Sequence, residues 1–317
     1  MAETFVLLLP GQGSQKVGMG RDLAEAFPAA RAVWQQVDET VGTPLSALAF
    51  DGPADELTRT HNAQPALLAH SAAVWAVIRE AIGDRVVAAA GHSLGEFSAH
   101  HVTGTLELAA AVRIVRRRGE LMYETGVRRP GAMAAILGVL GTPIDALCAE
   151  ASASHGLVVP ANYNSEEQVV ISGEVAGVEQ AMVLAKAAGA KRALPLPVSG
   201  AFHSPLMQPA VEGLSAAFAA ERWQAPRVPV VANVNAAFVT DAEDARRLLL
   251  EQLTAPVQWT AIVRALAARH PEATFVEIGT GAVLGGLVRR IAPALPVRAC
   301  GTVAEVEQLI AQAAEGT

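Results

Sequence analysis

The 317-residue chain contains only two cysteines, Cys148 and Cys300, and they form no Cys-x-x-Cys pair. This scarcity argues against a disulfide scaffold and against a zinc site, so we expect no bound metal and a reducing compartment. Aromatic residues make up 4% and charged residues 17% of the chain, whereas 51% is hydrophobic. Such an aliphatic composition excludes a disordered or collagen-like protein.

Positive charge is also in short supply, because 24 Lys and Arg stand against 31 Asp and Glu, a net charge of −7. Without an overall basic field, nucleic acid is not an expected partner. The N-terminus has no basic leader before its short apolar run 5–9, so no signal peptide is predicted. Uncharged stretches such as 130–144 contain Gly and Pro and are shorter than the ~20 apolar residues of a membrane helix. We therefore expect a soluble cytoplasmic protein that is not attached to a membrane.

Short apolar runs alternate with longer amphipathic segments, a pattern that predicts an α/β fold with a largely parallel sheet. The predicted strands are 5–9, 85–90, 229–234, 274–278 and 297–300. The predicted helices include 65–82, which has Pro65 in its first turn, and 107–124, 205–220 and 242–253.

One segment has a rhythm of its own, with strands at 132–139, 157–162, 168–172 and 192–196 and helices at 143–154 and 175–188. This βαββαβ order is the ferredoxin-like signature. We therefore predict a small subdomain at 131–197, inserted into a hydrolase-like α/β body formed by 1–130 and 198–317. A cleft is expected between the two.

The sharpest local motif is GHSLG at 91–95, which follows a predicted strand and precedes a helical stretch. This is the context of a nucleophile elbow, in which flanking glycines let strand and helix approach a serine held in a strained turn. The helix N-terminus then directs backbone N–H groups at an oxyanion. The motif makes Ser93 a candidate nucleophile, and the alternative is an ordinary glycine turn.

A serine nucleophile needs a base, and the chain has eight histidines. His203 is favoured because it lies in a loop, 199–205, at the junction between the small unit and a new helix, where loops line clefts. Solvated or capping roles are expected for six of the others, namely His61, His70, His100, His101, His155 and His270.

Two further features could serve the same site. The loop PGQGSQ (10–15) lacks the third glycine of a dinucleotide fingerprint, since Lys16 stands in its place, so we expect it to complete an oxyanion hole or to be a simple turn. The run Arg113, Arg116, Arg117 and Arg118 cannot face one way on a helix. One of these arginines could turn inward and bind a substrate carboxylate through its planar fork.

Taken together, eight ordered motifs resemble the malonyl-CoA:acyl carrier protein transacylase family through essentially the whole chain. They are PGQGSQ (10–15), QPA (64–66), GHSLGE (91–96), RG (118–119), GAMAA (131–135), NYNS (162–165), AFH (201–203) and PVQW (256–259). The family's fold is a hydrolase-like α/β body with a ferredoxin-like insertion. The chain departs from the family pattern at Phe97, where tyrosine is common, and at His100 and His101.

The resemblance implies a ping-pong transfer through a malonyl-serine intermediate. Ser93 would attack malonyl-CoA, with His203 as base and later as activator of the phosphopantetheine thiol of holo acyl carrier protein. The amides of Gln12 and Leu94 would hold the oxyanion, and the backbone carbonyl of Gln252 would orient His203. No tightly bound cofactor is implied, and we expect a monomer.

Further residues are carried over to the substrate pocket. Arg118 would pair with the malonyl carboxylate, although a helix register error of one residue would exchange it with Arg117. Phe202 would crowd the α-carbon and exclude methylmalonyl groups. The remaining expected pocket residues are His92, Asn162 and Gln64.

Docking of an acidic carrier protein would need a local basic rim. Lys191 and Arg192 are favoured because they lie near the joint of the small unit; other candidates are Lys186, Arg128, Arg129, Arg289 and Arg290. Three alternatives stay open: a discrete acyltransferase of a polyketide synthase or a malonate decarboxylase system, a serine hydrolase or thioesterase, and a binding protein with a vestigial site. The hydrolase would need an acidic residue to orient His203, and Asp145 is the only aspartate between Ser93 and His203.

Overall fold

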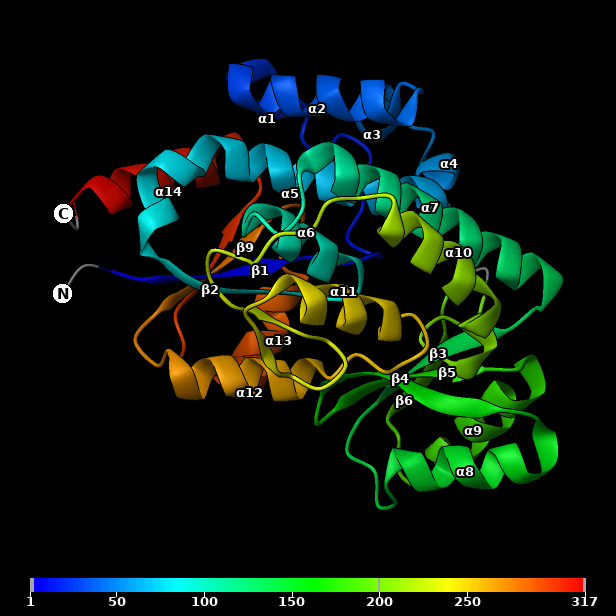
Figure 1. Ribbon diagram of the computed structural model, residues 1–317. Coiled ribbons are helices and arrows are strands. Elements are labelled where there is room, and N and C mark those ends of the chain that lie inside the picture. Colours follow the sequence, from blue (N-terminus) through cyan, green and yellow to red (C-terminus); the bar gives the residue numbers. More distant parts are fainter. Residues whose placement is uncertain (1–2, 199, 316–317) are drawn as a thin grey trace.

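A computed structural model describes residues 3–198 and 200–315, and its fold combines a six-stranded sheet with a four-stranded one (Figure 1). Ser199, part of the predicted base-carrying loop, lies outside the described residues. The larger sheet has the order β10-β9-β1-β2-β7-β8, and all of its pairs are parallel except β7 with β8. The predicted α/β class with a largely parallel sheet is confirmed.

The strands of the larger sheet match the predicted apolar runs closely. They are β1 (Phe5–Leu9), β2 (Val86–Gly91), β7 (Val230–Val231), β8 (Phe238–Val239), β9 (Thr274–Ile278) and β10 (Val297–Cys300). There are two exceptions: β8 was not predicted, and the predicted strand 229–234 pairs with β2 over two residues only. The chain leaves the sheet there because Asn233 turns toward the end of β2, where its side chain donates to the Gly91 carbonyl.

Helices cover both faces of this sheet (Figure 1). The helices of the large body are α1 (Arg21–Ala26), α2 (Pro28–Val41), α3 (Leu45–Asp51), α4 (Ala54–Thr58), α5 (Thr60–Ile82), α6 (Leu94–Val102), α7 (Leu108–Arg128), α10 (Gln208–Ala219), α11 (Ala242–Glu251), α12 (Trp259–Arg269), α13 (Val283–Ile291) and α14 (Val303–Glu315), with 3-10 turns at Gly83–Arg85 and Pro205–Met207.

Alternation along β1 divides the hydrophobic core between the two faces. Leu7 and Leu9 join a cluster with α5, α6 and α7, whereas Val6 and Leu8 join a second cluster with α12 and α13. Residues of a strand point alternately to opposite faces, so every residue of β1 is buried.

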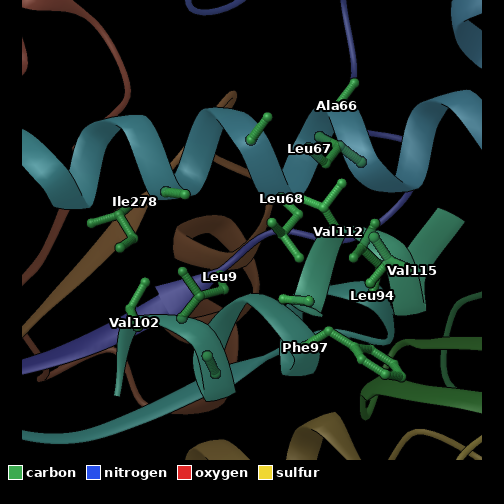
Figure 2. Packing of buried hydrophobic residues seen from close by; sticks show 14 of the residues in the cluster. Leu9, Ala66, Leu67, Leu68, Leu94, Phe97, Val102, Val112, Val115 and Ile278 are labelled. Carbon is green, nitrogen blue, oxygen red and sulfur yellow. The ribbon is translucent and has the colours of Figure 1, made fainter. Parts of the chain in front are cut away.

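Helix α6 is anchored inside the first of these clusters. Figure 2 shows Leu94, Phe97 and Val102 of α6 beside Leu9 and the α7 residue Val112. All five side chains are at most 3% exposed. The element that follows the serine is therefore fixed by packing along its length.

Helix α5 begins at Thr60, five residues before the predicted start at Pro65. A proline inside a helix leaves the carbonyl four residues earlier without its usual donor. Here that carbonyl belongs to His61, and it accepts a hydrogen bond from Arg116 Nη1 at 3.2 Å. Within the described residues, 60–85 is also the one helical stretch long and apolar enough to cross a membrane, but 61% of its apolar window is buried inside the protein.

The four-stranded sheet has the order β4-β5-β3-β6 and is antiparallel throughout. Its elements are β3 (Ala132–Leu137), α8 (Ile144–His155), β4 (Val158–Ser165), β5 (Gln168–Gly173), α9 (Val175–Ala187) and β6 (Arg192–Pro195). This is the predicted βαββαβ order in the predicted segment. Ala134 and Ile136 pack in a cluster with residues of α8 and α9, whereas their neighbours Met133 and Ala135 join the core of the large body.

The predicted solvated or capping roles are wrong for His70 and His100. His70 is 2% exposed and its Nε2 lies 3.0 Å from the Gly301 carbonyl, while His100 is fully buried with Nδ1 3.1 Å from Thr105 Oγ1. Both lie on helices that are buried on nearly all sides. The spacing of apolar residues in the sequence does not by itself reveal this burial. Burial lowers the pKa of His70 to about 4 and that of His100 to about 3, so both stay neutral.

Candidate active site

Ser93 lies in the sharp turn between β2 and α6, with φ 52° and ψ −107°. A non-glycine residue rarely adopts a positive φ, and such strain is typical of functional turns. The turn is possible because Gly95 has no side chain: a Cβ there would lie 2.0 Å from the Leu9 carbonyl oxygen of β1. The serine is thus held at the carboxyl edge of the large sheet and at the N-terminus of a helix.

Asn233, which the sequence analysis did not single out, fixes this turn. Its Oδ1 accepts from the Ser93 backbone N–H at 2.7 Å, and its Nδ2 donates to the Gly91 carbonyl at 2.7 Å. An asparagine has an acceptor and donors at opposite ends of one amide, so it can bridge both groups. The early end of β7 gives this residue its position.

His203 meets the serine from the loop that follows the small unit. Its Nε2 lies 2.7 Å from Ser93 Oγ, and its Nδ1 lies 3.0 Å from the Gln252 carbonyl and 3.2 Å from that of Ala255. Because both Nδ1 partners can only accept, we assign the proton to Nδ1, which leaves the Nε2 lone pair for the serine hydroxyl. Burial, together with the charge of Arg118, lowers the pKa of His203 to about 3. The imidazole is therefore neutral, the form that acts as a base.

No carboxylate contacts His203 Nδ1 among the described residues. Asp145, the aspartate that a hydrolase triad would need, instead accepts a hydrogen bond from the Tyr163 hydroxyl at 2.6 Å inside the small unit. The geometry is that of a serine and histidine dyad whose base is oriented by backbone carbonyls.

Arg118 extends from α7 toward the same serine and is 1% exposed. Its Nη2 lies 3.2 Å from Ser93 Oγ and 2.9 Å from Gln252 Oε1, and its Nη1 lies 2.7 Å from Gln64 Oε1. Its guanidinium also sits 5.3 Å from the centre of the Phe97 ring, a cation–π distance. Burial lowers the pKa of Arg118 to about 10, which still leaves it charged at neutral pH.

Its neighbour Arg117 points away from the site. Arg117 Nη1 lies 3.3 Å from carboxylate oxygens of both Glu120 and Glu124 at the surface. The structure thus separates the two arginines that the sequence left interchangeable, and Arg118 is the one that faces the serine.

A cavity of about 250 Å³ opens over the dyad. Its polar lining includes the predicted residues Gln12, His92, Asn162 and Arg118, besides Ser93 and His203; its apolar lining includes Met122, Met133, Leu196, Val198 and Phe202. Both the large body and the small unit therefore contribute to one pocket. Gln64 does not line this cavity and lies behind Arg118, which it contacts.

The loop 10–15 packs directly against the elbow. A Cβ on Gly11 would lie 2.3 Å from the His92 carbonyl oxygen, so only glycine permits this approach. Within the described part of the chain, the backbone N–H groups of Gln12 and Leu94 donate to no protein group. Two free donors beside Ser93 fit an oxyanion hole.

His92 and Asn162 occupy the wall beside the serine. His92 Nε2 lies 2.8 Å from Asn164 Oδ1, a partner that the sequence analysis did not identify, and its ring packs 5.6 Å from that of Trp259. Asn162 forms a bridge to Val257, which joins the small sheet to the body. Asn162 and Asn164 both lie in the NYNS motif (162–165), and alternate residues of one strand share a face. This motif was the signal for both asparagines in the sequence.

The predicted docking residues Lys191 and Arg192 are exposed at the start of β6, an edge strand of the small sheet. Leu196, four residues after Arg192, is part of the cavity lining. The other basic candidates, Lys186, Arg128, Arg129, Arg289 and Arg290, are exposed as well.

Comparison with known proteins places this geometry in context. The family model described as acyl transferase domain matches residues 4–307. The malonyl CoA-acyl carrier protein transacylase of Bacillus subtilis is 45% identical over 287 residues, 90% of each chain, and that of Salmonella typhimurium is 43% identical over 308 residues, 97% of this chain and 99% of the relative.

Two solved structures are similar over almost the whole chain. The acyl carrier protein S-malonyltransferase of Vibrio cholerae superposes with a TM-score of 0.91 at 41% identity, covering 96% of this chain and 99% of the other. A malonyl-transacylase solved in complex with a type II PKS acyl-carrier protein has a TM-score of 0.92 at 41% identity, covering 98% and 99%.

Proposed function

Because this chain belongs to the acyl transferase family and, within it, to the malonyl CoA-acyl carrier protein transacylases, we propose that it moves a malonyl group from malonyl-CoA to holo acyl carrier protein through an ester on Ser93. The observation that carries the proposal is the convergence of two groups on one hydroxyl. Ser93 Oγ lies 2.7 Å from the neutral base His203 and 3.2 Å from the buried guanidinium of Arg118.

In the first half-reaction, His203 Nε2 accepts the serine proton as Oγ attacks the thioester carbonyl. The negative charge that develops on the carbonyl oxygen is held by the free amides of Gln12 and Leu94. Collapse of this intermediate breaks the carbon–sulfur bond, and the imidazolium returns its proton to the departing coenzyme A thiolate. The Gln252 carbonyl stabilises the imidazolium through Nδ1.

Arg118 selects the acyl group by its free carboxylate. Its hydrogen-bond partners Gln64, Gln252 and Ser93 are all uncharged, so no carboxylate in contact neutralises it. A malonyl carboxylate supplies that charge by a bidentate pair, whereas an acetyl group leaves the buried cation unpaired, a penalty of about 2–5 kcal/mol. Phe202 lines the same cavity and crowds a substituent on the α-carbon.

In the second half-reaction, the phosphopantetheine thiol of the carrier protein enters the emptied pocket and His203 takes its proton. Thiolate attack on the Ser93 ester passes the malonyl group to the carrier, and the imidazolium of His203 returns the proton to the departing Ser93 Oγ. Lys191 and Arg192 dock the acidic carrier protein beside the pocket entrance, and the solved complex of a related transacylase with its carrier supports a protein partner. The enzyme acts in the cytoplasm as a monomer, without a tightly bound cofactor, a membrane or nucleic acid.

The physiological role is the supply of malonyl units for fatty-acid synthesis. A carrier of a polyketide synthase is the second candidate, favoured by the similarity to the type II PKS transacylase. The chemistry at Ser93 is the same in both, so only the carrier preference separates them.

Intact-protein mass spectrometry tests the reaction. Wild-type enzyme and Ser93→Ala are incubated with malonyl-CoA, and holo carrier protein is then added. We expect a malonyl adduct that requires Ser93 and passes to the carrier rather than to water. An adduct released as free malonate while the carrier is ignored would establish a hydrolase instead.

A further inference from the structure

Glu96 is a buried carboxyl one turn after the nucleophile, and the proposed reaction gives it no role. It lies on α6 and is fully buried. Its Oε2 accepts from Gln252 Nε2 at 2.6 Å and from the Asn233 backbone N–H at 3.2 Å. Its Oε1 has no partner among the described residues. A buried carboxyl with one oxygen unpaired is costly, so its presence beside the site calls for a function.

The contacts of Gln252 show what the carboxyl does. The Nε2 of Gln252 donates to Glu96 and also to the Ser93 carbonyl at 2.9 Å, and its Oε1 accepts from Arg118 Nη2 at 2.9 Å. If this amide were rotated by 180°, its N–H groups would face the N–H groups of the guanidinium and its oxygen would face the oxygens of the carboxyl. Glu96 and the Ser93 carbonyl are therefore the two acceptors that set which end of the amide faces Arg118, and Glu96 makes the shorter contact.

We propose that Glu96 is a positioning residue that fixes the side-chain amide of Gln252 and, through it, holds the guanidinium of Arg118 in place to receive the acyl carboxylate. This inference rests on the proposed function, in which Arg118 binds the malonyl group. Gln252 then has two separate tasks, because its backbone carbonyl meets His203 while its side chain meets Arg118.

The intervening amide keeps the buried carboxylate close to Arg118 without a direct ion pair. Burial raises the pKa of Glu96 to about 7, while its bonds from Gln252 and Asn233 and the charge of Arg118 act in the opposite direction. A direct pair would neutralise the guanidinium and compete with substrate. Contact through a neutral amide instead orients the cation and leaves it available, and Arg118 Nε still has no partner in the described part of the chain.

Glu96→Met and Glu96→Gln distinguish the role of Glu96 as a hydrogen-bond acceptor from its contribution to the stability of the fold. Methionine keeps the length of the side chain but removes the acceptor, whereas glutamine can accept from Gln252 and Asn233 through its amide oxygen. The measurement is kcat/KM for acylation of Ser93 by malonyl-CoA and, separately, by acetyl-CoA. We expect Glu96→Met to lose about tenfold more with malonyl-CoA than with acetyl-CoA, and Glu96→Gln to recover most of the malonyl preference.

Glu277→Met is the matched control. Glu277 is also buried, at 1% exposure, and accepts from the backbone N–H groups of Leu284 and Gly285, but it does not line the cavity. The same chemical change there should lower thermal stability and leave the malonyl-to-acetyl ratio unchanged.

Gln252→Met keeps the inference testable if Glu96→Met does not fold. It removes the side-chain amide but retains the backbone carbonyl at His203, and the same selective loss with malonyl-CoA is expected. If the variant that folds keeps the malonyl-to-acetyl ratio of kcat/KM, whether or not both values fall, the inference is overturned. Failure of the wild-type enzyme to form a malonyl ester would instead overturn the proposed function.

Discussion

The large body and the small unit contribute to the same cavity in different ways. The small unit here means 132–195, from the start of β3 to the end of β6. The body supplies Ser93, His203 and Arg118, the proposed nucleophile, base and carboxylate-binding residue, which hydrogen bonds hold together. The small unit supplies wall residues, among them Met133 and Asn162, and a sheet whose second face packs in a cluster with its own helices. We therefore assign the proposed chemistry and acyl selection to the body, and the shape of the pocket and its approach to the small unit. Substitutions in the two regions should therefore affect different steps.

His203→Ala is the strongest test on the side of the body. Removal of the base should lower the rate of Ser93 acylation by about 10²–10⁴-fold, because the hydroxyl loses its proton acceptor. Stopped-flow or quenched acylation by malonyl-CoA measures the loss. The matched control is His155→Ala, an exposed histidine of the small unit, which should leave acylation unchanged. A loss below tenfold for His203→Ala would remove this residue from the mechanism.

Arg118→Ala should lower kcat/KM for malonyl-CoA by about 10²-fold, since the substrate carboxylate loses its buried partner. Acetyl-CoA should be affected far less, so the preference between the two falls. Competition between both substrates followed by mass spectrometry reads the ratio. Arg117→Ala, one residue away at the surface, is the control and should keep the preference; a reversed pattern would contradict the assignment.

Phe202→Ala acts where the chain returns from the small unit to the body. Loss of the ring should raise acylation by methylmalonyl-CoA by about tenfold, the scale of one methyl group in an apolar pocket. Parallel assays with malonyl-CoA and methylmalonyl-CoA measure the change. Continued exclusion of methylmalonyl would mean that another residue limits the α-carbon.

Lys191→Glu and Arg192→Glu test the small unit. Each should raise the KM for holo carrier protein by about two- to fivefold, the scale of an exposed charge pair, more at low salt. Acylation of Ser93 by malonyl-CoA should stay the same. Val183→Ala is a control on the same unit with no change of charge. Equal effects on acylation and transfer would contradict a docking role.

The pH dependence gives the smallest expected effect. Burial lowers the pKa of His203 to about 3, and the neutral form is the base, so the active form persists as the pH falls. With acetyl-CoA, which does not depend on the carboxylate partner, kcat/KM should stay flat from pH 7 to about 5, whereas a free imidazole with a pKa of about 6.5 would lose most of its base form. A decline of kcat/KM centred near pH 6.5 would show that the pKa of His203 is not lowered.

The fold is predictable from the sequence where hydrophobic periodicity is strong. β1, β9 and β10 follow from short apolar runs, and the βαββαβ segment follows from alternating strand and helix patterns. The pattern fails at 229–234, because Asn233 leaves the sheet to hold the elbow, and at the start of α5, because Arg116 satisfies the carbonyl that Pro65 leaves free. Both exceptions depend on residues distant in the chain.

The candidate site divides in the same way. Ser93 and Arg118 lie in recognisable motifs, and His203 lies in a loop with few alternatives. Asn233 and the side chain of Gln252 carry no local signal, because their function is to bridge groups from three separate elements. Glu96 lies within a motif, yet its partner is 156 positions away, and spacing alone cannot reveal such a contact.

The position of β1 in the large sheet has a consequence for synthesis of the chain. β1 is the first strand made, but it lies between β2 and β9, and β9 begins at Thr274. One edge of this apolar strand therefore keeps its backbone N–H and C=O groups unpaired until most of the chain has left the ribosome, and such edges invite aggregation. A nascent chain halted before β9 already contains Ser93 and His203 but lacks the strand that completes the sheet. Maturation of the catalyst is thereby delayed until about the last seventh of translation.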